Sequence, residues 1–382
     1  MKRIAYLCCL LLCFLFPLSA LGESTLDDAL SRALDELDLS ALSAAFGSLT
    51  DGEDGLRALL AALVSGKQVW DGAALVQALL NRFLQAASAT VRRLPLLMAP
   101  ALLCGVMTRV RASLFRTQTG ALVETACFAA LAAVLARDLG AYLTLTAQSV
   151  TAMSSAMQTL FPLLVTLLSA VGGTAGAAVY QPAAAAAAGS MTTWVRAFTL
   201  RLALSYGTVV ILSHLSEQTR LKKLAALLRQ ATAWTLGAGF TLFLAVTALQ
   251  GTTAAARDGI GIRAAKYAAD NFVPVVGGMF ADTMDTLAGS SLIVKNALGV
   301  TGLAALLLLS AGPLLQTAAG CMLYKLAAGL LEPLAPDQLS DCLSDFSSVL
   351  SLLSAVQLSV GAMFFLLVAQ MLAAGNMIVM LR

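Results

Sequence analysis

The residues whose types and spacing could do chemistry are gathered between residues 257 and 296. Lys266 and Asp270 stand four apart, so on a helix their side chains can form an ion pair. Asp282 and Asp285 stand three apart, so their carboxylates share one helix face, where they could bind a cation or relay a proton. Two carboxylates without a third ligand do not define a metal site, and we expect neither a metal nor any other cofactor.

Between these two pairs the sequence predicts a broken helix. Pro274 removes a backbone donor, and Gly277 and Gly278 follow it. Charged, broken helices are tolerated at membrane depth only where they line a cavity or pack inside protein, and ionisable residues there are functional candidates. The alternative is a segment at the membrane surface with its charges in water. The candidate functional residues are Lys266, Asp270, Asn271, Pro274, Gly277, Asp282, Asp285, Lys295 and Asn296.

Sequence patterns of common enzymes are missing. The chain has no Walker A, HExxH or GxSxG sequence, and His214 is its single histidine. We therefore expect no catalytic residue and no enzyme activity, and any use of ATP would belong to a partner. No long basic run is present, so we expect no nucleic-acid partner.

The elements that must position these residues are membrane helices. Only 12% of residues are charged and 59% are hydrophobic, whereas soluble domains are about 25% charged. A helix needs about 20 apolar residues to cross the hydrocarbon core. The sequence thus predicts an all-α, multi-pass transmembrane bundle with seven spans, at 94–110, 120–136, 158–179, 198–215, 231–250, 297–318 and 349–374. Two stretches, 139–157 and 319–331, are predicted to be amphipathic helices at the membrane surface.

The region before the first span is predicted to start with a signal peptide and to continue outside the cytoplasm. Residues 1–22 have a basic start, an apolar stretch and small residues at Ala20 and Gly22, although an uncleaved anchor helix is the alternative. Residues 23–93 form an extracytoplasmic, amphipathic helical segment, with pieces near 55–65 and 72–93. Its acidic first part is either a solvated cap or a docking surface. Residues 94–382 form the membrane domain, with the broken, charged segment at 251–296.

The distribution of basic residues predicts the orientation. Seven spans after an outside N-terminus leave nine basic residues in the inside segments and six in the outside loops, and they place segment 251–296 in the cytoplasm. The basic cluster between Arg220 and Arg229 is then on the unfavourable side. A re-entrant hairpin at 158–179 is the alternative, and it would move that cluster inside and segment 251–296 outside.

Three stretches of sequence carry a resemblance to a known family. They are DNFVPVVGGMFADTMDTLAGSSLIVKNALGVTG (270–302), CMLYKLAAGLLEPLAPDQLSDCL (321–343) and MFFLLVAQMLAAGNMIVMLR (363–382). The chain resembles stage III sporulation protein AE, a membrane protein of endospore-forming Firmicutes. The layout of signal peptide, extracytoplasmic segment and multi-span body is also similar.

The resemblance implies a function in sporulation and offers no catalytic residue to carry over. Proteins of this family lie in the mother-cell membrane around the engulfed forespore. They belong to a channel-like complex, likened to secretion systems, that supports forespore development and late forespore-specific transcription. The implied partners are other membrane subunits of the stage III sporulation A complex and its cytoplasmic ATPase.

Two other functions stay open on the sequence alone. A stand-alone small-solute transporter would place its site at the broken helix 270–296, since transporters bind solutes at discontinuous helices. The chain shows no clear internal repeat of spans, which such transporters often have. An intramembrane enzyme using His214, Asp282 or Asp285 is the third hypothesis.

Overall fold

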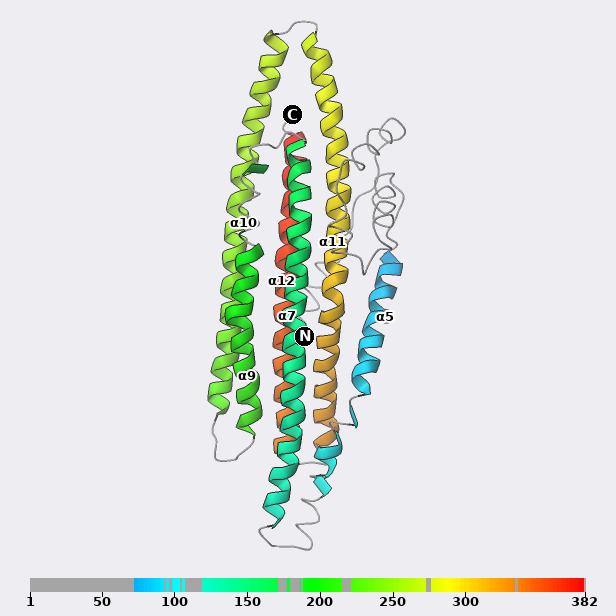
Figure 1. Cartoon of the computed structure of the whole chain (residues 1–382), viewed down its shortest axis with the longest axis vertical. Helices are drawn as coiled ribbons and strands as arrows, with labels where there is room; N and C mark the ends of the chain where they lie inside the picture. Colours follow the sequence, from blue (N-terminus) through cyan, green and yellow to red (C-terminus); the bar gives the residue numbers. More distant parts are fainter. Residues whose placement is uncertain are drawn as a thin grey trace.

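Long antiparallel helices make up most of the described part of the chain in this computed structural model (Figure 1). The structure describes residues 72–92, 94–95, 98–103, 105–106, 119–170, 177–178, 186, 188–214, 221–272, 276–333 and 336–380. Within these ranges, the side chains of 72–76, 78–79, 82, 119–125, 127, 170, 249–288, 290–291 and 374–380 are outside this description. The helices are α5 (Gly72–Val91), α7 (Thr119–Ala170), a π-helical turn η1 (Val195–Thr199), α9 (Leu200–Ser213), α10 (Lys222–Phe272), α11 (Val276–Leu331) and α12 (Asp337–Met380).

Five of the described helical stretches are long and apolar enough to cross a membrane. They are Phe128–Ser169, Ala188–Ser213, Lys222–Ala248, Leu292–Leu331 and Asp337–Ala373. Successive stretches run in opposite directions along the long axis of the molecule (Figure 1). The prediction of a multi-pass helical bundle is therefore confirmed, but the seven predicted spans are not.

The main correction concerns α7. The predicted spans 120–136 and 158–179 and the predicted surface helix 139–157 share a single helix that runs from Thr119 to Ala170. The prediction divided this stretch because threonine and serine residues stand between the apolar residues of its middle part. Tyr142, Thr146 and Val150 in that middle part are all buried, so packing against neighbouring helices continues through it.

Helices α11 and α12 are likewise longer than the segments predicted for them. The predicted surface helix 319–331 is the last part of α11, and the predicted span 349–374 lies inside α12. The first predicted span, 94–110, is described only in short pieces, so its crossing stays a prediction. The signal peptide and the piece near 55–65 lie outside the described residues. Helix α5 matches the amphipathic piece predicted near 72–93, and it packs against α11 (Figure 1).

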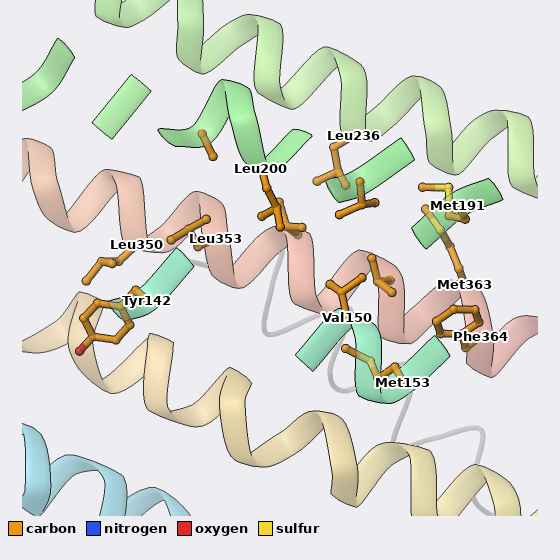
Figure 2. Packing of buried hydrophobic residues seen from close by; sticks show 14 of the residues in the cluster. Tyr142, Val150, Met153, Met191, Leu200, Leu236, Leu350, Leu353, Met363 and Phe364 are labelled. Carbon is orange, nitrogen blue, oxygen red and sulfur yellow. The ribbon is translucent and has the colours of Figure 1, made fainter. Parts of the chain in front are cut away.

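Helix α12 is at the centre of the bundle. It contacts α7, α9, α10 and α11, and no side chain between Phe346 and Leu372 is exposed. Figure 2 shows side chains of α7, of the segment around α9 and of α10 meeting Leu350, Leu353, Met363 and Phe364 of α12. Lipid is as apolar as these side chains, so the helices associate by close packing and buried polar contacts rather than by exclusion of water.

Glycines of α11 allow this close packing. A Cβ built on Gly302 would lie 2.7 Å from Cδ2 of Leu160 in α7. A Cβ on Gly299 would overlap Leu372 of α12, and one on Gly320 would overlap the Tyr142 hydroxyl. At three sites along α11, therefore, the packing leaves no room for a side chain, as expected where membrane helices approach closely.

We expect Gly302→Ala to lower the free energy of unfolding in detergent by about 1–3 kcal/mol, because the added methyl forces Leu160 to shift. The matched control is Gly329→Ala on the same helix, where a Cβ meets no atom within 4 Å. Thermal unfolding followed by circular dichroism gives the measurement. Equal destabilisation by both substitutions would contradict the packing described for α11 and α7.

Candidate functional site

The predicted functional residues are distributed around the hairpin of α10 and α11. Lys266, Asp270 and Asn271 lie in the last turns of α10, and Gly277, Asp282 and Asp285 lie in the first turns of α11. Helix α10 ends at Phe272 and α11 begins at Val276, so the predicted break falls between them, whereas Gly277 and Gly278 are within α11. Pro274 lies outside the described residues. The side chains of these residues are not described, so their functional role stays a prediction.

Lys295 and Asn296 are separated from the hairpin tip by more than four helical turns of α11. Lys295 is fully buried, and its Nζ donates to the carbonyl oxygens of Met371 (2.7 Å) and Leu372 (3.5 Å) in α12. Carbonyl oxygens accept hydrogen bonds from an ammonium group, which carries three donors. Lys295 is therefore a polar contact that joins α11 to α12, and the structure does not bring it together with the predicted residues of the tip.

The centre of the bundle contains a polar cluster that the sequence analysis did not identify. The Gln357 amide of α12 donates to Thr146 of α7 (2.9 Å) and to Thr317 of α11 (3.2 Å), and all three side chains are buried. Thr146 and Thr317 donate in turn to carbonyl oxygens of their own helices. The cluster thus joins three helices through satisfied hydrogen bonds. A carboxamide inside a predicted span was the available signal, since such groups need partners in lipid.

A second missed contact joins α7 to α11. The Tyr324 hydroxyl donates to the Asp138 carboxylate, and the Tyr324 ring packs edge-on against Phe346 of α12, with ring centroids 4.6 Å apart. Tyr324 is among the largest fully buried side chains. Asp138 falls between the predicted span 120–136 and the predicted surface helix 139–157, so it was not among the candidate residues.

His214 lies at the end of α9 and is buried. Its Nδ1 is 3.0 Å from the carbonyl of Val210 and 3.1 Å from the Ser213 hydroxyl. Its Nε2 is 3.5 Å from Oδ2 of Asp345, a distance suited to an ion pair but long for a hydrogen bond. This histidine therefore has the contacts of a structural group that attaches α9 to α12. In the described part of the chain no group of three or more His, Cys, Asp or Glu side chains could hold a metal ion.

The polar contacts described above are contacts within or between helices. Many of the described hydroxyl groups bond to carbonyl oxygens of their own helix, and the contacts of Gln357, Tyr324 and Lys295 connect neighbouring helices. Apolar antiparallel helices joined by buried polar contacts define a polytopic helical membrane protein.

Within that class, the chain belongs to the stage III sporulation protein AE family, whose match covers residues 55–375. The resemblance expected from the sequence is thereby confirmed. Stage III sporulation protein AE of Bacillus subtilis (strain 168) is 34% identical over 235 residues, which make up 62% of this chain and 59% of that protein. The aligned part therefore spans less than two thirds of the relative's length. No solved structure matches this chain.

We expect the Lys295 stem to matter more for stability than its charge. Lys295→Met keeps most of the volume, and an apolar replacement of a buried charge is often neutral, so the free energy of unfolding should change by less than about 1 kcal/mol. Lys295→Ala leaves a cavity and should cost about 2 kcal/mol or more. Thermal unfolding of both variants in detergent is the measurement. An equal loss in the two variants would show that the hydrogen bonds to α12 hold the helices together.

Proposed function

We propose that this chain is a membrane subunit of the channel-like, secretion-like complex that links mother cell and forespore during sporulation. In this proposal it is needed for forespore development and for late forespore-specific transcription. The supporting observation is family membership over residues 55–375, a range that includes every described candidate span. Its partners would be other membrane subunits of the stage III sporulation A complex and the cytoplasmic ATPase of that complex.

The proposed role is not catalytic. The sequence contains no nucleotide-binding or hydrolase pattern, and the buried side chains Gln357, Tyr324 and Lys295 bond helices to each other. Energy for any transport would therefore come from the ATPase partner. The chain's own contribution would be a path or a scaffold in the membrane.

The position of the helix break supports this function over that of a stand-alone transporter. Discontinuous helices that bind solutes in transporters are broken near the middle of the membrane. Here α10 and α11 extend past the ends of α7 and α12 and meet beyond them (Figure 1). A break at the tip of such a hairpin is better suited to contact with another subunit than to enclosing a solute.

We also propose an orientation that differs from the one predicted from seven spans. Because α7 is continuous, the chain has one crossing fewer than predicted, and the basic residues Lys222, Lys223 and Arg229 in the first turns of α10 lie toward the same end of the bundle as the start of α7 at Thr119 (Figure 1). Basic residues in short loops favour the cytoplasm. With the N-terminal segment extracytoplasmic and six crossings, the tip of the α10–α11 hairpin would lie outside the mother-cell cytoplasm, between the two membranes.

Deletion of the gene in a spore former that carries this chain should reduce the yield of heat-resistant spores to a small fraction of the parent's. A reporter of late forespore-specific transcription should fall with it. Expression of the intact chain from a mother-cell promoter should restore both, whereas expression from a forespore promoter should not. Normal spores in the deletion strain would remove the proposed function, and rescue from the forespore would remove the proposed location.

The orientation is tested by single cysteines at the two ends of α10. In protoplasts that express the full chain without its native cysteines, Lys266→Cys should react with a membrane-impermeant thiol reagent. Lys223→Cys, at the other end of α10, should react only after the membrane is opened. The reverse pattern would restore the cytoplasmic placement of segment 251–296 that the seven-span prediction contains.

A further inference from the structure

The outer face of α7 differs from those of the spans Ala188–Ser213, Lys222–Ala248 and Leu292–Leu331, which carry exposed large hydrophobic side chains. Apart from Pro162, every exposed side chain described between Ala126 and Thr166 is small or polar, and none of the described exposed large hydrophobic residues belongs to α7. From its middle upward, this face presents the polar stripe, which we define as Thr144, Gln148, Thr151, Ser155 and Gln158. All five side chains are exposed.

Helix α10 shows what a lipid-facing surface looks like in this protein. Leu227, Trp234 and Leu242 are 61%, 71% and 64% exposed, and Leu224 and Val246 mark the ends of this set. Residues 224–246 extend over about 33 Å at 1.5 Å per residue, close to the ~30 Å thickness of the hydrocarbon core. We call these exposed side chains the apolar belt.

Two contacts show which residues of α7 lie level with the apolar belt. Lys222 of α10 approaches Asp341 of α12 (3.9 Å), and Gln357 of α12 donates to Thr146 of α7 (2.9 Å). The three helices run in the same direction (Figure 1). With equal rise per residue, the apolar belt is level with about residues 132–154 of α7. Most of the polar stripe therefore lies at the depth of the hydrocarbon core.

The spacing of the polar stripe keeps it on one line along the helix. Its members are separated by four, three, four and three residues, the repeat that follows one face of a helix. The Thr144 and Thr151 hydroxyls donate to carbonyl oxygens of their own helix, Gly140 and Ala147. The exposed Gln148 amide lies at the depth of the apolar belt, where lipid could not hydrogen-bond to it, and exposed Gln158 continues the stripe beyond that depth.

We propose that the polar stripe of α7 lines a water-filled conduit in the half of the membrane nearer the α10–α11 hairpin tip, closed on its other sides by further subunits. This inference rests on the proposed function and assigns the conduit to one helix face. Water is favoured over a tightly packed partner helix by the Gln148 carboxamide at the depth of the apolar belt and by the continuation of the stripe past the belt to Gln158, where the conduit would open to water. A packed interface would instead be dominated by small residues, as the alanine-rich lower part of α7 is.

The test compares cysteines at equal depth on the two surfaces. The full chain, with its seven native cysteines replaced, is produced in sporulating cells with the rest of the complex present. Thr151→Cys and Thr144→Cys are paired with Leu242→Cys and Trp234→Cys, which the same alignment places level with them on α10. Membranes are treated with a charged, water-soluble methanethiosulfonate reagent, and the modified fraction is measured over time.

We expect the α7 cysteines to react at least about tenfold faster than their α10 partners, because the reactive thiolate forms in water and not in hydrocarbon. Equal, slow reaction at both helices would overturn the proposal, since the face would then contact lipid. Rapid disulfide cross-linking between two copies at position 151, with loss of reagent access, would also overturn it in favour of a packed second copy. Neither result depends on the spore yield, so failure here is distinct from failure of the proposed function.

A second measurement does not rely on thiol chemistry. Thr151→Lys should accumulate in the membrane at the parent's level if the stripe faces water, whereas Leu242→Lys should accumulate poorly, since a charge in lipid is costly. Poor accumulation of both lysine variants would count against the conduit.

Discussion

Close packing of α11 against α12 and α7 is the interaction on which the described structure depends. Apolar side chains gain little from leaving lipid for each other, so these helices need a fit that lipid cannot provide. Gly299, Gly302 and Gly320 allow backbones to approach, and Gln357 and Tyr324 add hydrogen bonds between helices. Helices α9 and α10 pack against each other and against α12.

This constraint explains how much of the fold could be predicted. The apolar runs at 231–250, 297–318 and 349–374 lie in helices of the structure, because a run of about 20 apolar residues is the length that a helix needs to cross the hydrocarbon core. The division of α7 failed because hydropathy sums a window and does not register which face each polar residue occupies. Thr146 points into the bundle and Thr144 out of it, yet both count equally against a span.

For the candidate site, the sequence indicated local backbone features but not the contacts between distant residues. The helix break around Pro274 was recognised because proline and glycine act locally, through the backbone alone. The partners of Lys295 could not be found in that way, because Met371 and Leu372 contribute carbonyl groups that every residue has. Likewise, Asp138 and Tyr324 are 186 positions apart, and only the tertiary fold brings them together.

The length of helix α11 has a mechanical consequence. It is 56 residues long and continuous from the hairpin tip to the opposite end of the bundle, so an axial displacement at the tip is transmitted along a stiff rod. Pro313 interrupts its backbone hydrogen bonding, because proline has no N–H to donate to the carbonyl four residues earlier. The Thr317 hydroxyl bonds to the Pro313 carbonyl one turn away, and Gln357 clamps that same threonine. The proline of α11 thus lies one turn from the point where hydrogen bonds of Gln357 join α7, α11 and α12, so a bend of α11 at Pro313 would disturb those bonds.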